Sequence, residues 1–156
     1  MIKLTRIDDR LVHGQVALVW TPALSADCLI VANDKVAKDE FLKMTLGFAK
    51  PSNAKLLIKS LEETSTFLND PANNNLKILL IINSVQDALT LTESVQEIKS
   101  VNFGGLRGKD GSRLITKAIA VTDEDVALSR KMLEKGIELE IRQVPNDKKQ
   151  LLQDLI

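Results

Sequence analysis

The chain contains one histidine, His13, which lies in the segment TRIDDRLVHGQVALVW at residues 5–20. A neutral imidazole is a good nucleophile near pH 7. When it attacks phosphorus it forms a phosphohistidine, which can hand the phosphoryl group on to a second acceptor. Phosphoryl transfer is therefore the first chemistry to consider for this segment.

Residues on both sides of His13 could serve that chemistry. Arg10 carries a planar guanidinium that matches the oxygens of a phosphate. Gly14 and Gln15, at the expected start of a helix, offer backbone N–H groups and the positive end of the helix dipole. Phosphoryl transfer depends on such positioning and on positive potential around the oxygens.

Two adjacent carboxylates, Asp8 and Asp9, precede His13. Either one could hold an imidazole nitrogen or the Arg10 side chain, and the sequence does not decide between them. The same residues could instead have purely structural roles. A lone histidine near a turn is often a polar loop residue, a nearby arginine often forms a surface ion pair, and adjacent aspartates often cap a helix.

Composition limits the classes of function. The 156 residues are 44% apolar and carry 21 basic and 21 acidic side chains, which is typical of one globular domain over residues 1–156. Balanced charge and scarce aromatic residues argue against nucleic-acid binding. The only cysteine, Cys28, lies in an apolar run and is expected to be buried. One histidine and one cysteine argue against a zinc site, and we expect no metal and no cofactor.

No targeting or membrane-spanning segment is expected. The chain starts with the strand-like MIKLTRI rather than with an apolar signal region. Its apolar runs are far shorter than the roughly 18 residues of a membrane span. The sequence therefore predicts a cytoplasmic protein.

Strand-like and helix-like segments alternate along the chain. Strands are expected at residues 2–7, 28–33, 54–60, 76–83, 97–103, 113–121 and 137–144. Helices are expected at residues 14–20, 34–50, 60–68, 84–94, 122–135 and 146–155. This alternation predicts an α/β fold with an open, mostly parallel sheet and helices on both faces.

Some boundaries have recognisable signals. Ser60 and Glu63 have the spacing of a capping box. Asp34 is expected to cap the helix at 34–50, and Pro22 is expected to end or kink the first helix. One face of the helix at 34–50 is expected to hold Val36, Phe41, Met44, Leu46 and Phe48.

Parallel α/β sheets bind ligands beyond the carboxyl ends of their strands. That rule brings together the segments at 8–14, 33–34, 83–84 and 102–112. His13 lies in the first of them. The expected fold and the chemistry of the imidazole therefore indicate the same place by separate arguments.

The segment RIDDRLVHGQVALVW resembles the phosphorylation-site segment of the IIB components of the mannose–fructose–sorbose class of the bacterial sugar phosphotransferase system. It contains the family's run R-[IV]-D-x-R-L-[IV]-H-G-Q-V. The resemblance continues through IVANDKVAKDEFLKMTLGFAKP, NFGGLRG and RLITKAIAVTDEDVALSRKMLEKGIELEIRQVPND, so that it covers nearly the whole chain.

This resemblance implies a phosphocarrier enzyme, a protein-histidine–sugar phosphotransferase, that works without a cofactor. His13 would accept a phosphoryl group from a phosphohistidine on a IIA domain and pass it to a sugar held by the membrane components IIC and IID. Arg10 matches the family arginine that meets the phosphoryl group. Asp9, Gly14 and Gln15 match positions with supporting roles. The family also implies an antiparallel edge strand in the sheet.

The resemblance places the chain in the cytoplasm, at the inner face of the membrane through IIC and IID. A homodimer is an arrangement that the sequence leaves open. The glycine-rich segment at 104–112 is a flexible loop in the simplest interpretation. In a second interpretation, Arg107, Lys109 and Arg113 help to dock an acidic partner near His13.

Two other classes of function remain as alternatives. The same crevice could bind a small ligand, with His13 forming only a hydrogen bond, or the chain could be a structural subunit of a membrane complex. Stable phosphate labelling of the imidazole separates the phosphocarrier from both. Thermal stabilisation by a nucleotide would favour the ligand-binding module.

Overall fold

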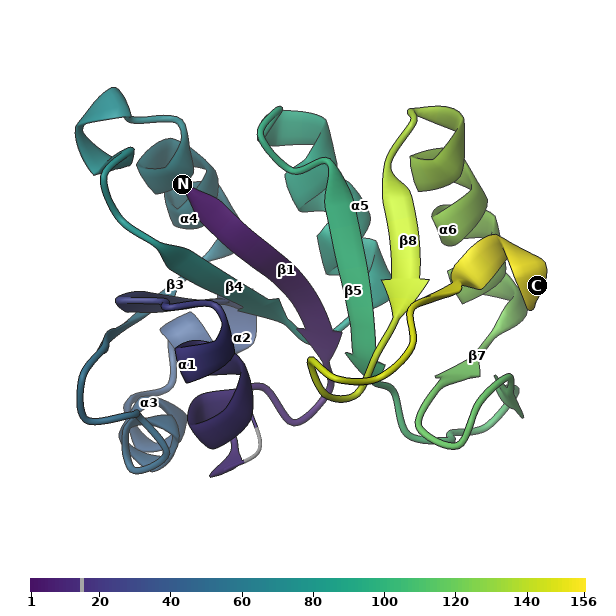
Figure 1. Cartoon of the computed structure of the whole chain (residues 1–156), viewed down its shortest axis with the longest axis horizontal. Coiled ribbons are helices and arrows are strands. Elements are labelled where there is room, and N and C mark those ends of the chain that lie inside the picture. Colours follow the sequence, from purple (N-terminus) through teal and green to yellow (C-terminus); the bar gives the residue numbers. More distant parts are fainter. Residues whose placement is uncertain (15) are drawn as a thin grey trace.

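The computed structural model of the chain describes residues 1–14 and 16–156, and Figure 1 shows how its elements are arranged. A seven-stranded sheet has the order β3-β2-β4-β1-β5-β8-β9. Its parallel strands are β1 (Ile2–Asp8), β2 (Cys28–Ala32), β3 (Lys55–Lys59), β4 (Ile78–Ile82), β5 (Ser100–Gly105) and β8 (Glu138–Ile141). The short strand β9 (Gln150–Leu151) pairs antiparallel with β8 at one edge. The mostly parallel sheet and its antiparallel edge strand are confirmed.

Helices cover both faces of the sheet, as predicted. They are the π-helical turn η1 (Val16–Trp20), α1 (Thr21–Ala23), α2 (Asp34–Ala37), α3 (Glu40–Gly47), α4 (Leu61–Leu68), α5 (Val85–Ser94) and α6 (Asp123–Glu134), with 3₁₀ turns η2 (Pro71–Asn73) and η3 (Leu152–Asp154). Strand β4 shows how the sheet separates two apolar layers. Leu80 and Ile82 pack with α5 and α6, whereas Leu79 and Ile81 pack with η1 and α2. Burial on both sides explains the unbroken apolar run of this strand.

The predicted capping box begins α4. The Ser60 hydroxyl accepts a hydrogen bond from the Glu63 amide at 3.1 Å, and the Glu63 carboxylate accepts one from the Ser60 amide at 2.9 Å. Both bonds satisfy amide groups that have no partner inside the helix. Local sequence alone was sufficient to place this boundary.

The single helix predicted at 34–50 is in fact two helices. Asn33, rather than Asp34, caps α2, because its side-chain oxygen accepts a hydrogen bond from a first-turn amide at 2.9 Å. Asp39 then caps α3 and divides the segment. A short polar side chain at such a position competes with the continuing helix by binding the free amides of a new one.

This division changes which side chains face the solvent. Phe41, Met44 and Phe48 are 74%, 62% and 84% exposed. Val36 is buried, and Leu46 contacts the second apolar layer. The predicted shared face is therefore wrong, since a periodicity counted across Asp39 mixes two helices that begin separately.

The glycine-rich loop was predicted to begin at residue 104, which is two residues before the loop begins in the structure. Strand β5 continues through Gly104 and Gly105, and both glycines are buried. Gly105 pairs with Asp8 of β1 across an irregularity in the register. These glycines are parts of the sheet beside the first strand, so the prediction of a flexible loop is wrong for them.

Two further elements differ from the prediction. Residues 113–121 do not form one strand, because β6 (Arg113–Leu114) and β7 (Ala120–Val121) pair antiparallel with each other in a separate hairpin. Residues 146–155 form β9 and η3 rather than a helix. Short segments have little helical stability of their own, so pairing with the edge strand β8 decides the outcome.

The first helical segment does not end at Pro22. The π-helical turn η1 ends at Trp20, and α1 continues to Ala23 with Pro22 in its first turn. Proline is tolerated in a first turn, where its missing N–H would have no helical partner. The helical conformation ends only with the cap at Leu24.

Candidate functional site

The His13 loop follows β1 at the carboxyl end of the sheet (Figure 1). Side chains alternate along a strand, so Ile7 packs into the apolar layer while Arg6 and Asp8 lie on the other face. After Asp8 the chain turns, and the Leu11 amide donates to the Asp8 carbonyl at 2.9 Å. Leu11 has a φ of 57°, which is rare for leucine, and burial of its side chain holds the turn. The turn brings His13 back to the end of β1.

Asp8 is the centre of this loop. Its side chain is fully buried, and its Oδ2 lies 2.9 Å from Nε2 of His13 and 3.2 Å from Nη2 of Arg6. Its second oxygen, Oδ1, accepts a hydrogen bond from the Arg10 backbone amide at 3.1 Å. Of the two aspartates that could hold the imidazole, Asp8 is the one that does.

This contact fixes the ring of His13. An ionised carboxylate can only accept hydrogen bonds, so this contact favours the tautomer in which Nε2 carries the proton and donates to Asp8. The second nitrogen, Nδ1, then holds the free electron pair. The His13 side chain is 20% exposed, so the ring is only partly buried. An imidazole oriented in this way could act as a nucleophile through Nδ1.

Arg10 and Gly14 lie on either side of His13 in the chain. The Arg10 side chain is 46% exposed, and its Nε lies 3.6 Å from Oδ1 of Asp8. A Cβ placed on Gly14 would meet no heavy atom of the described residues within 4 Å. An exposed guanidinium in this loop has the geometry to bind the oxygens of a phosphoryl group. Gln15, which was also predicted at this site, lies outside the described residues.

Asp9 has different surroundings from its neighbour. Its Oδ2 accepts a hydrogen bond from the Arg107 amide at 2.8 Å and lies 3.2 Å from Nε of the same side chain. The Asp9 amide donates to the Gly105 carbonyl at 2.9 Å. Asp9 therefore joins the His13 loop to the loop after β5.

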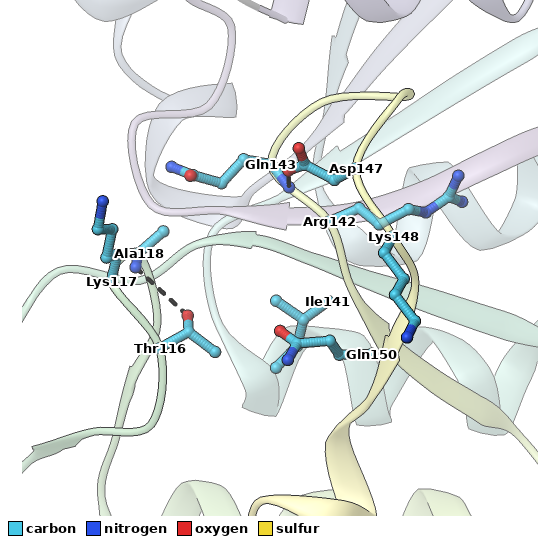
Figure 2. Close-up of a pocket in the computed structure, with 9 residues that line it drawn as sticks. All are labelled: Thr116, Lys117, Ala118, Ile141, Arg142, Gln143, Asp147, Lys148 and Gln150. Carbon is cyan, nitrogen blue, oxygen red and sulfur yellow. Dashed lines mark hydrogen bonds between the residues drawn. The ribbon is translucent and has the colours of Figure 1, made fainter.

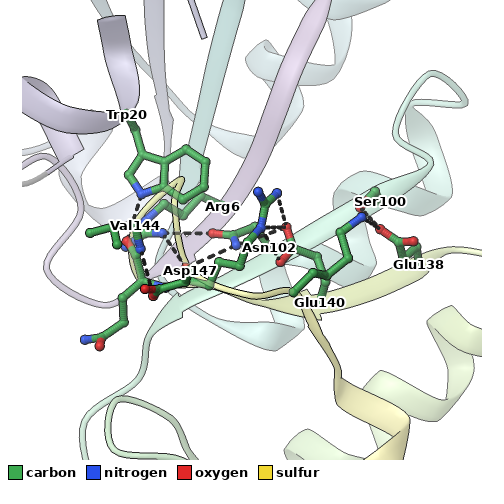
Figure 3. A network of polar contacts seen from close by, with 11 residues as sticks. Arg6, Trp20, Ser100, Asn102, Glu138, Glu140, Val144 and Asp147 are labelled. Carbon is green, nitrogen blue, oxygen red and sulfur yellow. Dashed lines mark hydrogen bonds and ion pairs between the residues drawn. The ribbon is translucent and has the colours of Figure 1, made fainter. Parts of the chain in front are cut away.

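Arg6 is a residue of the site that was not predicted. It belongs to a row of polar side chains under Trp20 (Figure 3), in which Arg6, Asn102 and Glu140 are register partners on β1, β5 and β8. Nη1 of Arg6 donates to Asn102 at 2.9 Å, and the Asn102 amide donates to Glu140 at 3.2 Å. The Trp20 indole N–H donates to the Gln143 carbonyl at 2.8 Å. A signal for Arg6 was present, because an arginine two residues after Leu4 lies on the same face of an inner strand and needs a buried partner there.

A cavity of about 390 Å³ lies next to this row, at the carboxyl end of β8 (Figure 2). Arg142 and Gln143 form part of its wall. The Arg142 carbonyl also accepts hydrogen bonds from Arg6 and Asn102 of the polar row, and the Gln143 carbonyl accepts one from Trp20. Lys117 and Lys148 line it as well, but Figure 2 shows their side chains extending in different directions. The cavity therefore lacks a pair of converging cations and is a weaker candidate than the His13 loop.

Other kinds of site find little support. Across residues 1–14 and 16–156, no helix is long and apolar enough to cross a membrane. Over the same residues, no group of three or more His, Cys, Asp and Glu side chains lies together as metal ligands would. Cys28 is buried in β2, and burial raises the pKa of its thiol, which disfavours the reactive thiolate.

Comparison with known proteins gives a consistent family. Residues 2–156 match the family described as PTS system sorbose subfamily IIB component. The chain is 36% identical to the PTS system fructose-specific EIIB component of Bacillus subtilis over 146 residues, covering 94% of this chain and 90% of that one. It is 34% identical to the PTS system mannose-specific EIIAB component of Escherichia coli over 156 residues, all of this chain and 48% of that protein.

A solved structure agrees in the whole fold. The crystal structure of the IIBSor domain of the sorbose permease from Klebsiella pneumoniae superposes with a TM-score of 0.93 at 31% identity, covering 99% of this chain and 94% of that one. The sequence match and the structural match thus extend over the same chain length. The chain belongs to the sorbose subfamily of IIB components of the sugar phosphotransferase system.

Proposed function

We propose that the chain is a phosphocarrier enzyme, a protein-histidine–sugar phosphotransferase. His13 accepts a phosphoryl group from a phosphorylated IIA domain and passes it to a sugar imported through the membrane components IIC and IID. The observation that carries this proposal is the 2.9 Å contact between His13 Nε2 and the buried Asp8 carboxylate. It leaves Nδ1 as the nucleophile of an accessible ring.

The first transfer exchanges one phosphorus–nitrogen bond for another. The electron pair of His13 Nδ1 forms a bond to phosphorus while the bond to the donor histidine breaks, and that pair returns to the donor ring. The His13 ring becomes positively charged and keeps its proton on Nε2. Asp8 stabilises this charge, since its carboxylate lies beside that proton. In the second transfer the sugar oxygen forms a bond to phosphorus, the phosphorus–nitrogen bond breaks and its electron pair returns to Nδ1 of His13, and the sugar hydroxyl releases its proton to solvent. The positively charged ring is a good leaving group for this step because it departs as a neutral imidazole.

Other residues of the loop bind or support the phosphoryl group. Arg10 places positive charge where the phosphoryl oxygens gain charge. Gly14 offers a backbone N–H group next to His13. Gln15 is assigned a supporting role from its place in the family's sequence motif. Asp9 supports the loop through its bonds to Arg107.

The partners follow from the family and its relatives. The Escherichia coli relative is named EIIAB, and this chain matches 48% of it, which supports a IIA part as the direct donor. The match to the sorbose subfamily of IIB components supports IIC and IID as the membrane partners. The chain then works in the cytoplasm, at the inner face of the membrane where IIC and IID are.

Arg10→Ala is expected to leave the fold intact and to slow phosphorylation of His13 by about 10²-fold or more. The fold persists because the side chain is 46% exposed and approaches Asp8 only to 3.6 Å. Single-turnover kinetics with phosphorylated IIA measure the effect. Arg10→Lys keeps the charge without the planar fork and should be intermediate. An unchanged rate for Arg10→Ala would remove Arg10 from the mechanism.

The basic loop after β5 is expected to contribute to docking of IIA through Lys109 and Arg113. Arg107 is left out because its side chain and amide already bind Asp9. Arg113 forms an ion pair with Asp123 at 3.2 Å, but this pair is exposed and screened by solvent, so Arg113 can exchange it for a partner. Replacing Lys109 and Arg113 together with alanine should weaken IIA binding several-fold and reduce its salt dependence.

The matched control for this loop is Lys131→Ala. Lys131 lies in the last turn of α6, toward the opposite end of the sheet from His13. Titrations of IIA at several salt concentrations measure both effects. Equal affinities and equal salt slopes for the double variant and the control would rule out a docking role.

A labelling experiment tests the proposed function. The purified chain is incubated with radiolabelled phosphoenolpyruvate, the general phosphotransferase proteins and a mannose-class IIA domain. We expect a label that is lost in acid, is stable in base and maps to the peptide that contains His13. Failure to label the chain by several IIA domains that are themselves phosphorylated would overturn the proposal and favour a ligand-binding module.

A further inference from the structure

Arg6 is a buried cation that is held from several sides. Its side chain is 0% exposed, and Nη1 donates to Asn102 at 2.9 Å and to the Arg142 carbonyl at 3.1 Å. The guanidinium lies 5.3 Å from the centre of the Trp20 ring. Nη2 bonds the Asp8 carboxylate at 3.2 Å. Burying a charge costs free energy, and packing alone does not offset that cost. The buried position of Arg6 therefore indicates a role other than packing.

The neighbouring strand leaves room for the guanidinium. Gly104 of β5 has no side chain, and a Cβ at this position would overlap the Arg6 guanidinium. Any other residue at 104 would push Arg6 away from its bonds. Gly104 is therefore required for space beside Arg6.

Arg6 and His13 bind the same oxygen atom, Oδ2 of Asp8. Burial lowers the pKa of the Arg6 guanidinium and Asp8 acts against that lowering, but a guanidinium stays charged at neutral pH. Without this cation, a buried carboxylate favours its protonated form. A protonated Asp8 would donate to Nε2 of His13 instead of accepting from it. The proton of the neutral ring would then lie on Nδ1, the nitrogen that has to attack.

We propose that Arg6 is a positioning residue for phosphoryl transfer: it holds Asp8 as a charged acceptor, so that His13 keeps its proton on Nε2 and presents Nδ1. This inference rests on the proposed function of His13 as phosphoryl acceptor. Arg6 acts through Asp8, because a side chain without exposed surface cannot touch the phosphoryl group. Arg10, which is 46% exposed, has the complementary role at the surface.

The single histidine of the chain permits a direct test. ¹⁵N NMR of the unphosphorylated chain, at a pH where the ring is neutral, shows which nitrogen of His13 carries the proton. We expect the Nε2–H form in the wild type. Arg6→Met removes the cation, whereas Gly104→Ala keeps it but displaces it. Both are expected to shift the ring toward the Nδ1–H form and to slow single-turnover phosphorylation by about 10²-fold or more.

Controls separate this role from general stability. Glu140 is 1% exposed and belongs to the same polar row, but its carboxylate accepts hydrogen bonds from Asn102 and Arg142 and none from Arg6. Glu140→Gln should therefore lower the melting temperature and leave the tautomer of His13 unchanged. Arg6→Lys keeps a positive charge but lacks the planar guanidinium that binds Asn102 and Asp8 at once. Compared with Arg6→Met, it should show a larger fraction of the Nε2–H form. If Arg6→Met does not fold, the His13 tautomer and the transfer rate are compared between the wild type, Gly104→Ala and Arg6→Lys.

The outcomes distinguish this inference from the proposed function. An Nε2–H ring and a wild-type rate in Arg6→Met or Gly104→Ala would overturn the role of Arg6 and leave His13 as the acceptor. Absence of label on the wild-type chain would instead refute the proposed function. The tautomer is measured without any phosphoryl donor, so neither result depends on the other.

Discussion

His13→Ala is expected to accept no phosphoryl group while it keeps its fold. The variant loses the nucleophile, and the chain has no second histidine to replace it. Asp8 remains paired with Arg6 and with the Arg10 amide, so no buried charge is left without a partner. The loss of one hydrogen bond should change the free energy of unfolding by about 1 kcal/mol. Labelling from phosphorylated IIA and thermal unfolding measure the two effects.

The control for His13→Ala is Cys28→Ala. Cys28 is the only cysteine of the chain and is also a potential nucleophile, but its side chain is buried in β2. This variant should take up label at the wild-type rate. Acid-labile, base-stable label on His13→Ala would contradict the assignment of His13. Circular dichroism of His13→Ala should match that of the wild type, so that loss of label is not explained by unfolding.

The parts of the fold that follow from local sequence were predictable. The apolar run of β4 indicates a strand buried on both faces, and the Ser60–Glu63 capping box marks the start of α4. The helix predicted at 34–50 fails because the cap at Asp39 starts a second helix within a continuous apolar pattern. The segment at 146–155 fails because pairing with β8 outweighs weak helical preference.

The location of the candidate site could be proposed from the sequence for a different reason. His13 is the only histidine, and the expected parallel sheet places its loop at the carboxyl ends of the strands. The choice between Asp8 and Asp9 was not predictable, because it depends on where β1 stops alternating and on the left-handed turn at Leu11. The role of Arg6 depends on its register with Asn102, which is a long-range property of the sheet.

Asp8→Asn is expected to lower both the stability of the fold and the rate of transfer. An amide keeps one acceptor oxygen, but its NH₂ group would face either the donors of Arg6 and His13 or the Arg10 backbone amide. Arg6 would remain buried without a counter-ion, and breaking a buried ion pair in this way costs about 3–5 kcal/mol. The His13 tautomer would no longer be fixed, so the rate should fall roughly 10²- to 10⁴-fold. Urea unfolding and single-turnover labelling measure the two losses.

Asp9→Asn makes the same chemical change one residue further along the chain. The Asp9 side chain is 22% exposed, and its partner Arg107 is 71% exposed, so solvent screens this pair. We expect a loss of stability below about 1 kcal/mol and a rate close to that of the wild type. The difference between the two variants isolates the buried carboxylate that holds the ring. Equal rates for Asp8→Asn and Asp9→Asn would show that the orientation of His13 does not depend on Asp8.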